Sequence, residues 1–233
     1  PAGEDAAGAP AGDSPQIGDY LAAEVLDRVA PADRAFLLRT SILERMCGPL
    51  CDAVLEQEGS AARLEELDRR NLFVVGLDRR RRWYRYHHLF SDLLRARLQT
   101  EEPAAAAALH GRAAAWLATE GEVAEAIGHA IAAGDRDTTA RLVAAHWLTF
   151  FNQGWLMTVG RWLDALPRDL LAADPRLWLA RAWTFMDLGE LDEAGAWLQA
   201  APAEDEWVGV LRALRLFKLG DVGGAADAVG AAV

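Results

Sequence analysis

A repeating interval of glycine residues constrains the fold of this chain more than any other feature of its sequence. Four glycines in the second half are separated by 33, 35 and 31 residues: Gly121, Gly154, Gly189 and Gly220. Three of these glycines are followed five residues later by an alanine: Ala126, Ala194 and Ala225. Such a period, with small residues at fixed offsets, is typical of stacked helical hairpins, because only small side chains let neighbouring helices approach closely. Residues 104–233 are therefore predicted to form a solenoid of helical hairpins.

Apolar residues in the same region follow helical spacing. Two stretches place apolar side chains at positions i, i+3, i+4 and i+7: Leu179, Ala182, Trp183 and Met186, and then Trp207, Val210, Leu211 and Leu214. Asp174 before Pro175 is a typical helix start, because the Asp side chain caps the first turn and proline suits its first position. These patterns predict a TPR-like domain made of helices.

The residues before the repeats are organised differently. Residues 1–17 are rich in Ala, Gly, Pro and Asp, which predicts a flexible linker. Apolar spacing then predicts helices within residues 20–29, after Pro31, across residues 50–55 and after Ser60. Gly59 is expected to end the third of these helices, and Ser60 to cap the fourth.

A change of pattern after these helices predicts a β-hairpin. Leu72–Val75 and Trp83–Tyr86 are short β-branched and aromatic runs, and the polar residues 78–82 between them form a turn. Helical spacing returns at four apolar residues: Phe90, Leu93, Leu94 and Leu98. Helices followed by a hairpin and a closing helix are the order of a winged helix. Residues 18–100 are therefore predicted to form a winged-helix-like module.

The fold class that follows is mainly α: a winged-helix-like module with a small β-hairpin, followed by a TPR-like helical-hairpin solenoid. We place the join between the two domains at residues 99–108, because Pro103 prevents a helix from running straight through this segment.

Composition excludes several classes of protein. Apolar residues make up 52% of the chain, enough for a packed core, but no uninterrupted apolar stretch is long enough to span a membrane. The N-terminus has neither a basic start nor an apolar run, which argues against a signal peptide, and its lack of an initiator Met suggests a cut end or a join. We expect a cytoplasmic protein in which Cys47 and Cys51 are small, buried, reduced side chains.

The sequence carries no recognisable catalytic motif. A phosphate-binding loop that ends in Lys-Ser or Lys-Thr is excluded, because the only lysine is Lys218. Two cysteines are too few for a closed zinc site. The five histidines show no metal-ligand spacing beyond one adjacent pair: His87, His88, His110, His129 and His146. We therefore expect no enzymatic activity, no metal site and no cofactor in this chain.

Charge is distributed unevenly along the sequence. The net charge is −11, yet residues 63–97 hold ten arginines and five acidic residues, a local charge of +5. Four arginines form the turn of the predicted hairpin and are candidates for a basic wing that binds phosphates: Arg79, Arg80, Arg81 and Arg82. The helix that would enter the DNA groove carries Glu65, Glu66 and Asp68, which repel phosphates. Direct DNA binding is therefore not expected, and a solvated turn or a contact with an acidic domain remains the alternative.

Tryptophan is concentrated in the repeat half of the chain. Eight of the nine tryptophans lie there: Trp116, Trp147, Trp155, Trp162, Trp178, Trp183, Trp197 and Trp207. Aromatic side chains can stack on sugars and other ligands in the groove of a solenoid. At helical spacing, packing between helices is the simpler interpretation, and it is preferred here.

Several stretches, taken in order, resemble one bacterial protein family. They are Phe36–Leu43, Leu50–Val54, Asn71–Phe73, Trp83–Phe90, Leu93–Leu98, Leu109–Trp116 and Ala126–Asp135. Together they are similar to the central part of the large ATP-binding LuxR-type transcription regulators, the MalT-like group of STAND ATPases. The resemblance runs from about residue 18 to about residue 165, and beyond that it is only one of helical repeats.

The resemblance implies an architecture that extends beyond these residues. The family begins with a nucleotide-binding domain, continues through a winged helix into a helical-repeat sensor, and ends in a LuxR-type DNA-binding domain. By this resemblance, ATP or ADP binds the parent protein outside this chain, and an inducer or regulatory protein binds the repeats. In related STAND proteins a histidine at the start of the last winged-helix helix touches a phosphate of the nucleotide. His87 matches that position best, and His88 lies beside it.

Three functions remain open at this point. The leading one is a regulatory and protein-interaction segment that relays inducer or partner sensing to an ATP switch outside the chain. The first alternative is a stand-alone winged-helix DNA-binding repressor with a helical dimerisation domain. The second is a scaffold or adaptor built on a solenoid, and self-association is left open for all three.

Overall fold

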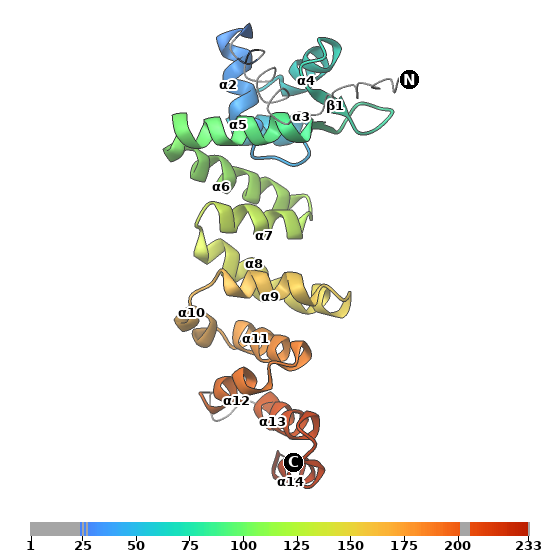
Figure 1. Ribbon diagram of the computed structural model, residues 1–233, viewed down its shortest axis with the longest axis vertical. Coiled ribbons are helices and arrows are strands. Elements are labelled where there is room, and N and C mark those ends of the chain that lie inside the picture. The colour runs from blue at the N-terminus through green and yellow to red at the C-terminus, as the bar shows by residue number, and fades with distance from the viewer. Residues whose placement is uncertain (1–23, 25, 27, 201–205, 233) are drawn as a thin grey trace, which may run out of the picture. The chain divides into compact units, whose positions relative to one another are not determined.

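A computed structural model describes residues 24, 26, 28–200 and 206–232 (Figure 1). By its internal contacts the chain divides into two compact units, residues 1–116 and 117–233. The predicted linker, residues 1–17, lies outside the described residues, as does most of the helix expected within residues 20–29. Glu24, Leu26 and Arg28 are helical. No helix in the described part of the chain is long and apolar enough to cross a membrane.

The first unit contains the winged-helix elements in the predicted order. Its helices are α2 (Pro31–Thr40), α3 (Gly48–Leu55), α4 (Ser60–Arg69) and α5 (His88–Glu101). Strands β1 (Val74–Gly76) and β2 (Tyr84–Tyr86) lie between α4 and α5 and form an antiparallel hairpin. The mainly helical fold class with a small hairpin is therefore confirmed.

Two helix boundaries in the first unit differ from the sequence prediction. The third predicted helix, α3, ends at Leu55, where Glu56 takes a left-handed conformation (φ 53°), rather than at Gly59. Gly59, not Ser60, is the N-cap of α4, with φ 89°. Ser60 is the first helical residue, and its backbone N–H donates to the Asp52 carboxylate at 2.9 Å. Asp52 thus supplies from α3 the acceptor that the Ser60 side chain was expected to provide.

The hairpin is anchored in the core through one of its faces. Val74 pairs with Tyr86, and Gly76 with Tyr84. The side chains of Val74, Tyr84 and Tyr86 are buried, and the Tyr86 hydroxyl lies 2.6 Å from the Thr40 hydroxyl of α2. Successive residues of a strand point to opposite sides, so the intervening residues of the hairpin face outward.

A break between helices falls where Pro103 predicts one. Helix α5 ends at Glu101, and α6 (Pro103–Thr119) begins at the proline. Glu102 lies between the two helices with a non-helical backbone (φ −135°, ψ 54°), and its N–H still donates to the Leu98 carbonyl. The predicted domain boundaries themselves remain a prediction.

The second unit consists of helices that pair with their neighbours in sequence. They are α7 (Val123–Ala132), α8 (Arg136–Asn152), α9 (Leu156–Asp164), α10 (Arg168–Ala173), α11 (Pro175–Leu188), α12 (Leu191–Gln199), α13 (Glu206–Lys218) and α14 (Val222–Ala232). The recurring glycines all lie in the turns between helices with positive φ, from 78° at Gly189 to 86° at Gly220. Glycine adopts this backbone conformation without the strain a side chain would add.

Small residues and caps in this unit lie where the sequence predicts them. Ala126 and Ala194 have no exposed surface, and Ala225 is 8% exposed, so all three lie where helices touch. Asp174 is the N-cap of α11, and its side chain accepts a hydrogen bond from the Arg176 backbone N–H at 2.9 Å. Not every residue of the predicted apolar stripes is buried, however. In α13, Leu211 is buried as predicted, but Trp207 and Val210 are 42% and 45% exposed, and Val208, outside the predicted stripe, is buried.

Candidate interaction site on the hairpin

The outward face of the hairpin combines apolar and basic side chains. Val75 lies opposite Arg85 in the register, and the Leu77 N–H donates to the Trp83 carbonyl at 2.7 Å. Val75 and Leu77 are 44% and 47% exposed, and Arg85 is also exposed. The alternation that buries Tyr84 and Tyr86 therefore leaves these residues on the opposite side of the sheet.

A third backbone segment brings another arginine to this face. Met46 and Tyr84 exchange two backbone hydrogen bonds of 2.7 and 2.8 Å, and the Met46 side chain is buried in the core. Because neighbouring residues alternate, Arg45 lies on the outward side, and its guanidinium is 4.5 Å from the centre of the Trp83 ring. This cation–π contact holds a positive charge over the hairpin.

The two candidate histidines lie where β2 leads into α5. His87 is the N-cap of α5: its N–H donates to the Phe73 carbonyl at 2.8 Å, and its carbonyl accepts from the Ser91 N–H at 2.9 Å. The His87 side chain does not cap the helix. Both imidazoles are exposed, and their ring centres are 4.4 Å apart. The backbone is thus fixed on both sides of His87 while its ring reaches solvent.

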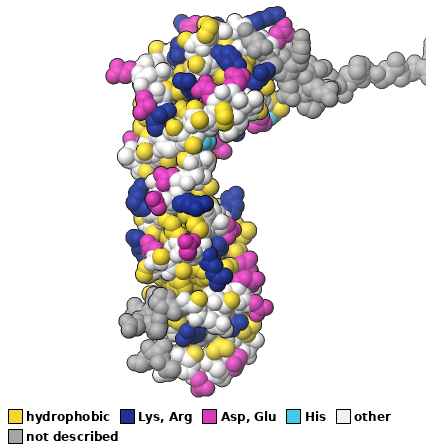
Figure 2. Space-filling view, turned by 90° about the vertical axis from the view of Figure 1, so that its left-hand side faces the viewer, with side chains coloured by type: hydrophobic (Ala, Val, Ile, Leu, Met, Phe, Trp, Pro, Cys, Tyr) yellow, Lys and Arg dark blue, Asp and Glu magenta, His cyan; other side chains and the backbone are white. Residues whose placement is uncertain are grey.

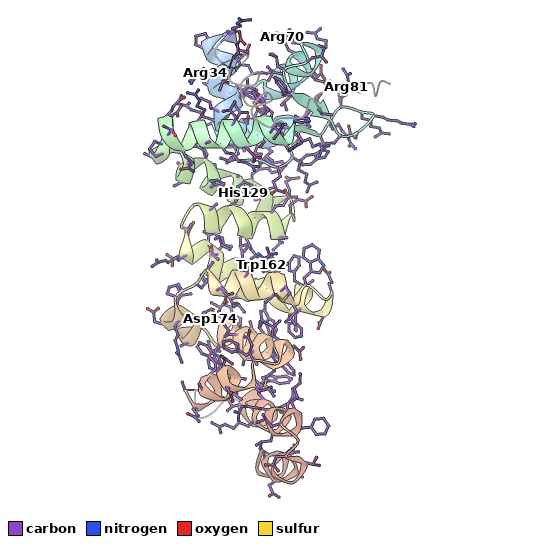
Figure 3. All side chains as sticks on the ribbon, viewed as in Figure 1. Arg34, Arg70, Arg81, His129, Trp162 and Asp174 are labelled. Carbon is purple, nitrogen blue, oxygen red and sulfur yellow. The ribbon has the colours of Figure 1, made fainter. Side chains whose placement is uncertain are left out.

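Two of the four arginines of the wing form ion pairs with described acidic residues, and the other two do not. Arg81 (φ 50°) forms an ion pair of 3.4 Å with Asp68 of α4, and Arg82 one of 3.4 Å with Asp78 (Figure 3 labels Arg81). The backbone N–H of Arg82 also donates to Asp78, and this hydrogen bond is the main reason that the pKa of Asp78 is lowered. Arg79 and Arg80 are exposed and form no ion pair with any described residue.

The helix that a DNA-binding winged helix would place in the groove carries acidic residues on its outer side. Leu64 and Leu67 of α4 are buried, whereas Glu65 is exposed and Glu66 pairs with Arg69. Negative charge at this position repels a phosphate backbone. The free arginines Arg79 and Arg80 therefore lie at the tip of a hairpin whose neighbouring helix opposes DNA.

Both sets of candidate residues flank β2: the arginines lie in the loop before it, and the histidines follow it at the start of α5. We did not predict Trp83, Arg45, Val75 or Leu77 as part of a site. The strict alternation within residues 83–87 was the available signal, because it places Trp83, Arg85 and His87 on one side of the strand.

The cysteines and most of the tryptophans have packing roles. Cys47 and Cys51 are unbridged and buried, and burial is the main cause of the raised pKa of Cys51. Among the described residues no group of three His, Cys, Asp or Glu side chains could hold a metal ion. Four of the tryptophans in the repeat unit are buried: Trp147, Trp162, Trp178 and Trp197. Trp155 and Trp207 keep 47% and 42% of their surface exposed.

A comparison with known protein families identifies the domain to which this hairpin belongs. Residues 22–106 match the model of a family described as the MalT winged helix domain. The match includes α2 to α5, the hairpin, both histidines and the four arginines of the wing. It supports the conclusion that this chain contains a segment of a MalT-like regulator.

Proposed function

We propose that this chain is the winged-helix and helical-repeat segment of a bacterial MalT-like regulator of the LuxR family, and that it relays inducer or partner sensing to an ATP switch outside the chain. The match of residues 22–106 to the MalT winged helix domain is the observation that carries this proposal. On this account the chain is not an enzyme, and ATP or ADP binds an upstream nucleotide-binding domain of the STAND type.

The geometry around His87 suits the relay role. Its ring is exposed at the N-terminus of α5, where the helix dipole also favours an anion. An imidazole can donate a hydrogen bond to a nucleotide phosphate and lose that contact when the domains separate. His88 is close enough to share this role, and Arg85 adds a positive charge on the same hairpin.

The repeat unit supplies the sensing part of the proposal. TPR-like hairpins offer an extended surface for an inducer or a regulatory protein. Apolar side chains reach the surface of this unit between arginines, as Figure 2 shows. By their exposure, four large apolar residues of this unit reach solvent: Leu148, Trp155, Met157 and Trp207.

A reporter assay on the intact regulator tests the proposal. His87→Ala should raise basal transcription without inducer, because the phosphate contact that holds the resting state is lost. His87→Gln, which keeps a hydrogen-bond donor, should restore part of the repression, and the repeat-unit variant His146→Ala should have no effect. If His87→Ala leaves basal transcription unchanged while circular dichroism shows a folded protein, the histidine has no switch role.

One observation favours the alternative of a DNA-binding repressor, namely the two free arginines at the tip of the wing. Neutralising Arg79 and Arg80 together separates the two functions. A repressor would lose operator binding, whereas the relay segment would keep its nucleotide-dependent behaviour.

A further inference from the structure

One residue at the base of the hairpin has a backbone conformation that its side chain disfavours. Among the described residues other than glycine, four have positive φ: Glu56, Asn71, Phe73 and Arg81. Glu56 caps the end of α3, and Arg81 lies in the turn of the hairpin. Asn71 ends α4 with the hydrogen bonds of a Schellman motif, in which Asn is tolerated at this position. Phe73, directly before β1, is at neither kind of position, and its φ of 56° is strained for a bulky residue.

The strained backbone determines where the Phe73 ring lies. The ring stacks on that of Phe90 in α5, with ring centres 4.8 Å apart. Phe90 is 1% exposed and also meets the edge of the Tyr86 ring at 6.0 Å. Regular alternation would instead place Phe73 on the outward side of the hairpin, with Val75 and Leu77. The left-handed backbone thus brings the ring onto α5, and the stacking there offsets the strain.

The same conformation ends the strand pairing at His87. Because Val74 pairs with Tyr86, the continued register would pair Phe73 with His87. The His87 N–H donates to the Phe73 carbonyl at 2.8 Å, but between these two described residues the reciprocal bond is not formed. The His87 carbonyl accepts instead from the Ser91 N–H at 2.9 Å. His87 therefore leaves the sheet at this point and begins the helix.

An extended backbone at Phe73 is the alternative arrangement, and it is free of this strain. The Phe73 N–H would then face the His87 carbonyl and complete a regular antiparallel pair, at the expense of the bond from Ser91. The Phe73 ring would leave Phe90 and lie on the outward side of the hairpin, next to the His87 side chain. The two arrangements therefore differ in whether His87 belongs to the start of α5 or to the sheet.

We infer that Phe73 is a positioning residue for His87, and that its backbone is a two-position latch at the base of the hairpin. The left-handed position, which stacking on Phe90 stabilises, makes His87 the N-cap of α5 and leaves its ring open to solvent. The extended position moves His87 into the sheet, beside an aromatic ring. The latch itself is independent of the proposed function, and only its effect on nucleotide binding rests on that function.

Hydrogen exchange of the Ser91 amide in this chain tests the latch, because only the left-handed position protects this amide. Phe73→Ala loses the ring but keeps the strain, so exchange should be at least about fivefold faster than in the wild-type protein. Phe73→Gly loses the same ring but adopts positive φ without strain, and it should restore most of the protection. Phe73→Tyr keeps the ring and should match the wild type. The Leu94 amide, further along α5, should not change in any variant.

Leu72 provides the matched control, because its φ is not positive. At that position glycine should protect the Ser91 amide no better than alanine, which is the usual order of the two residues. Exchange in Phe73→Gly as fast as in Phe73→Ala would overturn the latch, since the backbone conformation would then have no role. Wild-type exchange in Phe73→Ala would overturn it as well.

The effect of ADP on this exchange in the intact protein tests whether the latch positions His87. If ADP contacts His87 only in the left-handed position, saturating ADP should slow Ser91 exchange in Phe73→Ala about tenfold, by the factor that His87→Ala costs in ADP affinity. Unchanged Ser91 exchange, where His87→Ala does weaken ADP binding, would refute the positioning role. If His87→Ala leaves ADP affinity unchanged, the proposed function fails instead, and Ser91 exchange in this chain still decides the latch.

Discussion

In the first unit, polar contacts join residues far apart in sequence, whereas in the repeat unit they join near neighbours. Arg34 pairs with Glu101 and Arg39 with Glu102, across 67 and 63 residues (Figure 3 labels Arg34). Arg112 donates to the Val54 carbonyl across 58 residues. In the repeat unit, Lys218 donates to the Met186 carbonyl across 32 residues and Arg215 to the Leu191 carbonyl across 24, both between neighbouring hairpins.

This difference has consequences for stability and for signalling. A globular unit whose contacts are long-range is expected to unfold as a whole. A repeat unit is held by nearest-neighbour contacts and can open locally or transmit a change from one hairpin to the next. The comparison predicts that mutations in the two units differ in how far their effects spread.

Overpacking a contact between repeats should have the largest effect. Ala194 has no exposed surface, so Ala194→Leu should destabilise the repeat unit by about 1–3 kcal/mol. Urea unfolding measures the change, and hydrogen exchange should show the loss of protection confined to residues 117–232. Ala196→Leu is the control, because Ala196 is exposed. Equal stability of the two variants would show that the helices do not touch at Ala194.

Removing a helix cap should have a smaller, pH-dependent effect. The Asp135 carboxylate accepts from the Thr138 N–H at 3.0 Å, and this bond is the main cause of its lowered pKa. Asp135→Ala should destabilise α8 by about 1 kcal/mol at neutral pH. Folding lowers the pKa of Asp135. The stabilisation that its charge gives is therefore fully present above the pKa that Asp135 has in the unfolded chain, and it is lost as the pH falls through the pKa that Asp135 has in the folded protein.

The free energy of unfolding, measured from neutral to acidic pH, tests the direction of this pH dependence. The difference between the wild-type protein and Asp135→Ala should shrink as the carboxylate becomes protonated. Asp135→Asn keeps a capping oxygen without the charge, and it should remove most of the pH dependence but little of the stability at neutral pH. A difference that grows on acidification would contradict the assignment.

Two tyrosines of the hairpin should respond differently to loss of the hydroxyl. The Tyr86 hydroxyl is hydrogen-bonded to Thr40 at 2.6 Å, so Tyr86→Phe should destabilise the first unit by about 1 kcal/mol. The Tyr84 hydroxyl is buried without a hydrogen-bond partner among the described residues, and Tyr84→Phe should be close to neutral. Chemical denaturation of both variants measures the contrast, and the reverse order would refute this view of the core.

The smallest expected effect concerns DNA. At about 0.15 M salt this chain should give no mobility shift that survives competitor DNA, because the charge of α4 opposes the wing. Replacing Arg79, Arg80, Arg81 and Arg82 should therefore change nothing in this assay. A specific shift that disappears in that variant would identify the winged helix as a DNA reader.

Sequence periodicity predicts most of the fold in both units. The spacing of Gly121, Gly154, Gly189 and Gly220 gives the turns of the repeat unit, because glycine is favoured at their positive φ values. Periodicity fails where a neighbour from another element decides the outcome. The start of α4 is an example, because the acceptor for its N-terminus comes from Asp52 of α3 rather than from Ser60.

The candidate site is predicted in part. The run of charge in the sequence indicates the arginines of the turn, whereas His87 and His88 are indicated only by the family resemblance. The sequence does not indicate the Arg45–Trp83 contact, since the bridge between Met46 and Tyr84 joins residues 38 positions apart. Nor does it reveal that α14 presents Val222 and Val229 to solvent, because helical spacing alone does not say which neighbour covers a face.

The central claim is that the hairpin of the winged helix contacts a nucleotide held by another domain, and ADP affinity tests it most directly. Isothermal titration of the intact protein with ADP should show an affinity about tenfold or more weaker for His87→Ala than for the wild-type protein, since a hydrogen bond to a charged group contributes about 1.5–3 kcal/mol. This chain alone should bind no nucleotide at micromolar concentrations. Unchanged ADP affinity in a folded His87→Ala protein, or micromolar binding by this chain alone, would contradict the account.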